Sequence, residues 1–76
     1  MQISSKDLSY LSDEMSWELI AFKKCNHFAG EVQDPQVKAA INKIGAMHQQ
    51  HYQELLQCLQ SANGSNAQMQ SNSYIQ

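Results

Sequence analysis

The chain carries three side chains that can bind a metal ion, Glu18, His48 and His51, at positions where its spacing predicts apolar residues. Carboxylate oxygens and neutral imidazole nitrogens that project inward from facing helices are the donors with which helical bundles hold metal ions. Glu14 and Glu54 lie one turn away and could assist as further ligands, although charges at bundle edges are by default surface residues. We therefore expect either a metal site built from these five residues or a simple ion pair between Glu18 and His48.

Two helices must position these residues. Apolar residues recur from Leu8 to Ala29 with the period of an α-helix, and Ser4 precedes them as an N-cap, which predicts a helix over about 5–30. Asp34-Pro35 is a strong second helix start, and Asn63-Gly64 is a stop signal, which predicts a second helix over 35–62. The short loop between them forces the two helices to run antiparallel.

The hairpin geometry predicts which residues face one another. Both helices rise about 1.5 Å per residue away from the loop, so residues equally far from the loop share a level. Ala29 and Val37 flank the loop and should face each other. Eleven residues further from the loop on each helix, Glu18 should lie opposite His48, and His51 lies one turn beyond His48. An ionised glutamate between helices needs a compensating partner, so a metal or the imidazole must compensate Glu18. If the bundle rotates slightly, Glu18 lies in solvent instead.

A chain of 76 residues with 42% apolar content is near the lower size limit for an independent hydrophobic core. Small folds are usually completed by disulfides, a metal or oligomerisation. Cys25 and Cys58 lie near opposite ends of the hairpin and cannot pair within one chain, which leaves a disulfide between chains open. We predict an all-α fold in which an antiparallel two-helix hairpin dimerises into a four-helix bundle, with the copies parallel or antiparallel. Two-fold pairing would gather both copies of Glu18 and His48 in one layer.

Charge and hydropathy argue against several functions. The net charge is -2, and all five basic residues are lysines that form no basic stripe, which argues against a nucleic-acid or membrane partner. No apolar run approaches the roughly 18 residues that cross a bilayer, and no signal sequence is apparent. We expect a soluble protein of the cell interior. No nucleophile with an adjacent base and no phosphate loop supports hydrolase or transferase activity.

A family resemblance rests on Glu18, the Asp34-Pro35 turn and His48-x-x-His51-Tyr52-x-x-Leu55-Leu56. Over roughly residues 5 to 60, this pattern resembles short Firmicute proteins related to the spore coat protein F family. The resemblance implies a ferritin-like fold. Ferritin-like di-iron proteins such as rubrerythrin have a Glu-x-x-His motif in the second helix, and pairing two halves completes their site.

The sequence departs from that motif in either of two alignments. His48 stands in the place of the usual bridging glutamate, so zinc or a single metal ion fits this chain as well as a di-iron centre. If the alignment shifts by one turn, His51 and Glu54 form a reversed motif instead.

The resemblance implies a small structural or assembly protein in the cytoplasm or the spore coat. Its partners would be a second copy, in a homodimer or a higher oligomer, and spore coat proteins. The alternative function is a dimeric metal-binding protein that holds iron, zinc or manganese at the Glu/His site. Residues 63–76, which are rich in Ser, Asn and Gln, are predicted to form a flexible tail that docks through Tyr74 and Ile75. A second contact surface is predicted on the outer side of the first helix, at Tyr10, Trp17 and Ile20.

Overall fold

Capping interactions fix both ends of the first helix, α1, which spans Ser5–Glu31. The computed structural model describes residues 3–67. The Ser4 hydroxyl accepts a hydrogen bond of 3.0 Å from the Asp7 amide, one of the N–H groups that a helix start leaves unpaired. At the other end the Val32 amide donates to the Phe28 carbonyl at 3.0 Å, and Val32 itself is extended. The observed helix is one residue longer than the predicted range of about 5–30.

Asp34 and Pro35 begin the second helix, α2, which spans Pro35–Ala67. The Asp34 carboxylate accepts hydrogen bonds from the amides of Gln36, at 2.7 Å, and Val37, at 3.0 Å. Pro35 occupies the first helical position, where a missing N–H needs no partner. The second helix therefore begins where the Asp-Pro pair predicts, after a connection of residues 32–34.

The far end of α2 differs from the prediction. The helix continues through Asn63-Gly64 to Ala67 instead of ending near Ala62. Glycine costs a helix about 1 kcal/mol relative to alanine but leaves its hydrogen bonds in place, and no proline interrupts this stretch. Part of the predicted flexible tail, residues 63–67, is thus helical. The rest of the tail lies outside the described residues, with the predicted docking residues Tyr74 and Ile75.

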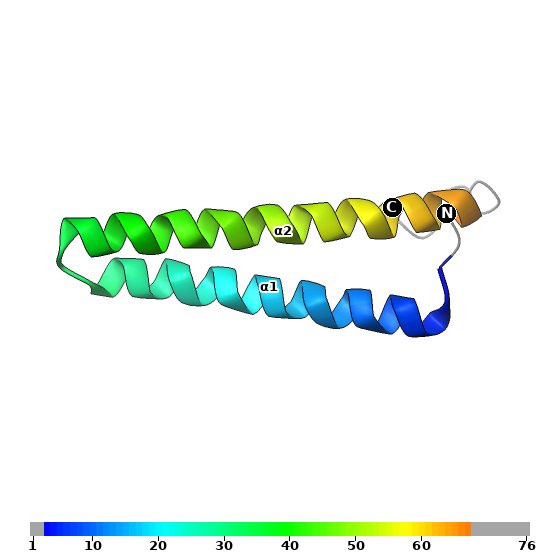
Figure 1. Ribbon diagram of the computed structural model, residues 1–76, viewed down its shortest axis with the longest axis horizontal. Helices are drawn as coiled ribbons and strands as arrows, with labels where there is room; N and C mark the ends of the chain where they lie inside the picture. Colours follow the sequence, from blue (N-terminus) through cyan, green and yellow to red (C-terminus); the bar gives the residue numbers. More distant parts are fainter. Residues whose placement is uncertain (1–2, 68–76) are drawn as a thin grey trace.

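The two helices run antiparallel and side by side (Figure 1). The molecule measures 52 × 25 × 15 Å, and residues 3–67 contain no strand. The predicted all-α antiparallel hairpin is confirmed. Its pairing with a second copy to form a four-helix bundle stays a prediction.

The most enclosed residues of the hairpin are small. Ala29, Gly45 and Ala62 are the buried residues of the described chain. A Cβ atom added to Gly45 would lie 3.0 Å from the Cβ atom of Cys25, so the backbones approach closely here. Hydrophobic stabilisation scales with apolar area removed from water, about 25 cal/mol per Å². Because no large side chain of the described residues is fully enclosed, packing within one chain supplies little hydrophobic stabilisation.

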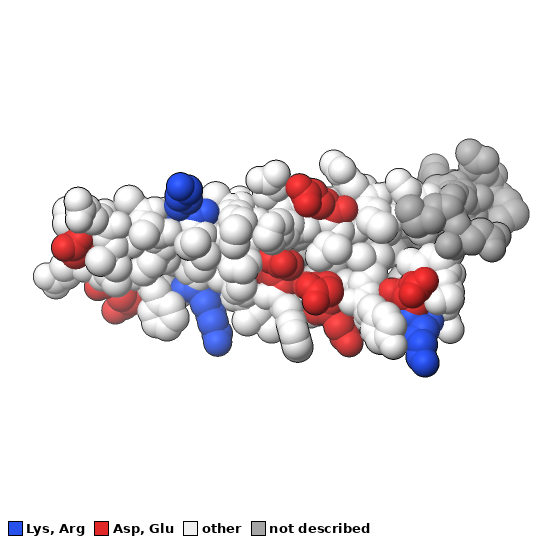
Figure 2. Space-filling model, viewed as in Figure 1, with Lys and Arg blue, Asp and Glu red and all other residues white. Residues whose placement is uncertain are grey.

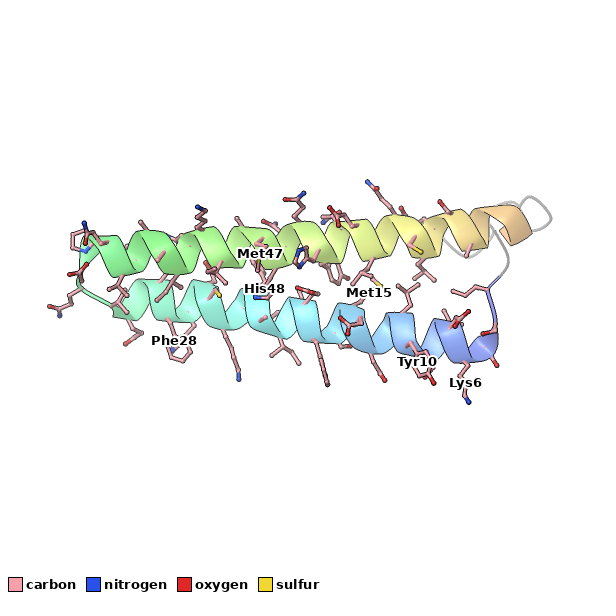
Figure 3. All side chains as sticks on the ribbon, viewed as in Figure 1. Lys6, Tyr10, Met15, Phe28, Met47 and His48 are labelled. Carbon is pink, nitrogen blue, oxygen red and sulfur yellow. The ribbon has the colours of Figure 1, made fainter. Side chains whose placement is uncertain are left out.

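Many of the larger apolar side chains remain in contact with solvent. Trp17 is 70% exposed, Tyr10 59% and Ile20 51%, so the outer position predicted for these three residues is confirmed. Figure 3 shows Tyr10 and Phe28 projecting away from α2, whereas Met15 and His48 lie between the helices.

Charged side chains are dispersed along the molecule. On the face shown in Figure 2 the basic side chains lie apart from one another, with acidic side chains between them. Neither helix of the described residues has a stretch that is apolar enough to span a bilayer.

Candidate metal centre

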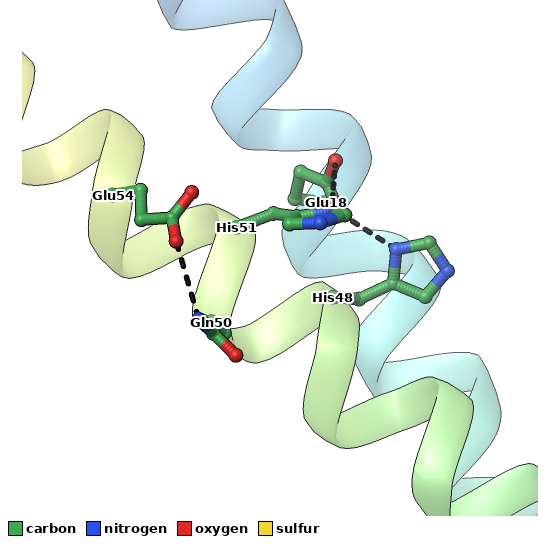
Figure 4. Close-up of polar contacts among 5 residues, drawn as sticks. All are labelled: Glu18, His48, Gln50, His51 and Glu54. Carbon is green, nitrogen blue, oxygen red and sulfur yellow. Dashed lines mark hydrogen bonds and ion pairs between the residues drawn. The ribbon is translucent and has the colours of Figure 1, made fainter.

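Glu18, His48 and His51 meet between the two helices (Figure 4). Glu18 lies near the middle of α1, and the two histidines are three residues apart on α2, so both imidazoles project from one side of that helix. Nδ1 of His48 lies 2.7 Å from Oε1 of Glu18. Nδ1 of His51 lies 3.3 Å from Oε2 of the same carboxylate. The predicted facing of Glu18 and His48 is therefore observed, and His51 joins the same carboxylate.

The cluster is partly shielded from solvent. The Glu18 side chain is 16% exposed, that of His48 25% and that of His51 43%. Glu18 thus lies inside the hairpin rather than in solvent. The side of the cluster formed by His51 is the most exposed to solvent. The two imidazole rings meet edge to face, with their centroids 6.1 Å apart.

Electrostatics keep Glu18 ionised. The hydrogen bond from His48 lowers the pKa of Glu18, partial burial opposes this change, and the charges of both histidines and the His51 contact reinforce it. An ionised carboxylate can only accept hydrogen bonds. With Glu18 ionised, the hydrogen of the His48 ring must therefore lie on Nδ1 for the 2.7 Å contact to be a hydrogen bond.

One ligand atom from each of Glu18, His48 and His51 can be chosen so that all three lie within 4.8 Å of one another. Such a group can bind a metal ion, or it can act as a network in which one carboxylate accepts from two imidazoles. No other group of three such ligands occurs among the described residues.

The other two predicted ligands lie elsewhere. Glu54 accepts a hydrogen bond of 3.2 Å from Gln50, which is also on α2 (Figure 4). Glu14 is exposed and lines a groove on the surface of the hairpin. Neither belongs to the three-residue group. Their positions match the surface role that is the default for charges at a bundle edge.

Two cysteines and a third histidine lie outside the cluster. Cys25 and Cys58 are free thiols, in agreement with their predicted separation within one chain. His27 contacts the ring of its neighbour Phe28, with ring centroids 5.1 Å apart. Gly45, which permits the close approach to Cys25, was not anticipated. The available signal was a lone glycine inside a strongly helical pattern, where it costs the helix stability and has no side chain to keep a neighbouring helix away.

Two grooves run along the hairpin. The first, which we call the uncharged groove, has volumes of about 440 and 140 Å³ in two parts that share Leu19 and Tyr52. Its lining consists of Leu8, Leu11, Ser12, Met15, Ser16, Leu19, Phe22, Gln49, Tyr52, Gln53 and Leu59. The second, which we call the acidic groove, has volumes of about 380 and 270 Å³ in two parts that share Tyr10 and Glu14. Its lining consists of Ile3, Asp7, Tyr10, Leu11, Asp13, Glu14, Trp17, Leu55 and Cys58.

The fold and the cluster define a class of protein, a helical hairpin that holds one carboxylate and two imidazoles between its helices. The chain belongs to the same family as YuzM of Bacillus subtilis (strain 168), a protein described as uncharacterized. The two are 43% identical over 58 residues, which make up 76% of this chain and 72% of YuzM. No protein-family model matches the chain, and no solved structure gives a significant match. The resemblance to the spore coat protein F family and to ferritin-like proteins stays a prediction.

Proposed function

We propose that this protein is a small structural subunit of the spore-coat type, whose working form is a homodimeric four-helix bundle. The observation that carries the proposal is the uncharged groove. It runs past both helices and is lined by apolar and neutral polar side chains only. Apolar surface of this kind marks an interaction site, and two helical hairpins that cover one another's open side make a four-helix bundle.

Charge selects the uncharged groove over the acidic groove as the dimer interface. In a two-fold dimer the same patch meets itself. Pairing through the acidic groove would bring together two sets of Asp7, Asp13 and Glu14 with no lysine in the lining, and like charges across an interface cost several kcal/mol. Pairing through the uncharged groove carries no such penalty.

Two observations support the spore-coat part of the proposal. The pattern of Glu18, Asp34-Pro35 and the His48 to Leu56 segment resembles proteins of the spore coat protein F family, and the family member YuzM comes from Bacillus subtilis. In addition, the described residues form a hairpin with two grooves whose linings share only Leu11. A subunit that pairs through one groove keeps the other for a further partner, as an assembly requires.

The dimer is tested by sedimentation equilibrium of the full chain over a range of micromolar concentrations. We expect a reversible dimer. Changing Ser16→Glu places a charge in the uncharged groove, and because Ser16 is exposed in the single hairpin the change leaves the hairpin itself intact. We expect the dimer dissociation constant to rise about tenfold or more, which corresponds to at least about 1.4 kcal/mol.

Ser9→Glu is the matched control, because Ser9 is an exposed serine of the same helix that lines neither groove. The control variant should remain a dimer. A wild-type chain that stays monomeric at high concentration contradicts the proposal, and so does a Ser16→Glu variant that dimerises as well as Ser9→Glu. Far-UV circular dichroism of each variant verifies that the helices are retained.

The spore-coat assignment needs a separate measurement. A fluorescent fusion of the chain, expressed in sporulating Bacillus subtilis, should collect at the surface of the developing spore. Fluorescence that remains spread through the mother cell would contradict the assignment without affecting the dimer.

A further inference from the structure

The cluster of Glu18, His48 and His51 has the donors of a metal site that is complete within one chain. We propose that it binds one divalent ion of the zinc class, with one ligand atom from each of the three residues and a fourth position open to water. Three protein ligands of the His₂Glu type plus an open position are a recurring zinc arrangement. Here the three come from the two facing helices of a single hairpin.

The distances fit one ion. Bonds of about 2.0–2.1 Å in tetrahedral geometry place neighbouring donor atoms roughly 3.3 Å apart. The Nδ1 atoms of His48 and His51 lie 2.7 and 3.3 Å from Oε1 and Oε2 of Glu18, respectively. One ligand atom from each residue can be chosen with all three within 4.8 Å of one another, so changes of up to about 1.5 Å in these separations gather the three ligands around one ion. The backbone already holds both imidazoles on one side of α2.

Metal binding would replace the contacts that now hold the cluster together. Each imidazole turns its Nδ1 atom toward the carboxylate. When the ring hydrogen moves to Nε2, Nδ1 presents a lone pair at the same place, and a cation can bridge the three ligands. The 43% exposure of His51 leaves the open position accessible from solvent.

The number of carboxylates determines which metal chemistry fits. A di-iron or di-manganese centre needs several carboxylates to bridge and neutralise two ions. This cluster has one, because Glu14 and Glu54 are not members of it. Two imidazoles and one carboxylate suit Zn²⁺, and affinity for Mn²⁺ should be the weakest of the first-row divalent ions.

The inference does not depend on the proposed dimer, because no ligand comes from a second chain. It predicts one metal ion per chain in monomer and dimer alike. An ion that joins α1 to α2 also stabilises the folded hairpin, since binding to the folded form alone shifts the unfolding equilibrium.

Cobalt(II) titration of the metal-free full chain tests the site, because Co²⁺ takes the place of Zn²⁺ and absorbs visible light in tetrahedral sites. We expect visible bands that saturate at one Co²⁺ per chain, disappear when Zn²⁺ is added, and accompany a rise in the thermal unfolding midpoint. His48→Gln and His51→Gln should each weaken Co²⁺ binding about tenfold or more, which is at least about 1.4 kcal/mol.

The chain contains its own controls. His27→Gln removes an exposed imidazole outside the cluster, and Glu54→Gln removes a carboxylate outside it, so both variants should bind Co²⁺ as the wild type does. Circular dichroism of each metal-free variant shows whether the helices persist. Three results would overturn the proposal: no binding by the wild type, unchanged binding in the His48→Gln, His51→Gln double variant, or cobalt–thiolate absorption that assigns the ion to Cys25 or Cys58.

Discussion

The close approach of Gly45 to Cys25 gives the sharpest stability prediction. A methyl group at position 45 would place two Cβ atoms 3.0 Å apart, whereas carbon atoms in good contact lie about 3.5–4.0 Å apart. The Cys25 Cβ atom is fixed to its backbone, so a side-chain rotation cannot relieve the contact, and the helices must separate. Overpacking of this kind costs about 1–3 kcal/mol, while alanine gains about 1 kcal/mol over glycine inside a helix. Gly45→Ala should therefore leave the free energy of unfolding unchanged or lower it by up to about 2 kcal/mol.

Gly30→Ala is the matched control. Nothing lies within 4 Å of a Cβ atom added at this position near the end of α1. The same substitution then shows the backbone effect alone, a gain of about 0.4–1 kcal/mol. Urea unfolding followed by circular dichroism, at one protein concentration for all variants, should separate the two free energies of unfolding by about 0.4–3 kcal/mol.

A second substitution at Cys25 identifies the contact responsible. Cys25→Gly removes the opposing Cβ atom, whereas Cys25→Ala keeps it. In double-mutant cycles with Gly45→Ala, the glycine should give a favourable coupling of about 0.5–3 kcal/mol, and the alanine should give almost none. If Gly45→Ala stabilises the protein as much as Gly30→Ala does, the reasoning from close approach is wrong.

Two further predictions concern a helix start and the cluster. Asp34→Ala removes the acceptor for the amides of Gln36 and Val37 and should lower the free energy of unfolding by about 1 kcal/mol, with Asp34→Asn close to wild type in the same urea assay. The pKa of Glu18 in the folded chain lies below its ordinary value of 4.5, so its ionised form contributes stability that is complete above pH 4.5 and is lost as the pH falls below it. Glu18→Gln should therefore flatten the decline of unfolding free energy below pH 4.5, and an equally steep decline in this variant would refute the assignment.

The sequence predicted the hairpin because its signals were local. Ser4 and Asp34 each supply a hydroxyl or carboxylate where unpaired N–H groups begin, and the Asp34-Pro35 pair leaves only a short connection. Once the end of the first helix and the start of the second are known, the fixed rise per residue determines which side chains share a level. The contact between Glu18 and His48 follows from that counting alone.

Other features depend on three-dimensional detail that periodicity does not contain. Asn63-Gly64 is a stop signal by composition, yet a helix can pass through it because glycine weakens hydrogen-bonded turns without breaking them. The spacing of residues along the helices also could not decide whether Glu14 and Glu54 join the cluster. A carboxylate one turn away from the cluster can point either between the two helices or out to solvent. Only the positions of the side chains show that Glu54 pairs with Gln50.

The short connection at residues 32–34 has a consequence for the chemistry in the middle of the hairpin. The connection is followed directly by α2, and one residue inserted into that helix between Pro35 and His48 would turn the two histidines by about 100° and shift them by about 1.5 Å relative to α1. Both imidazoles would then leave the carboxylate together, although no ligand had been replaced. Surface loops ordinarily tolerate changes in length. In this protein, the 30-residue separation of Glu18 and His48 makes the number of helical residues on each side of the connection part of the definition of the site.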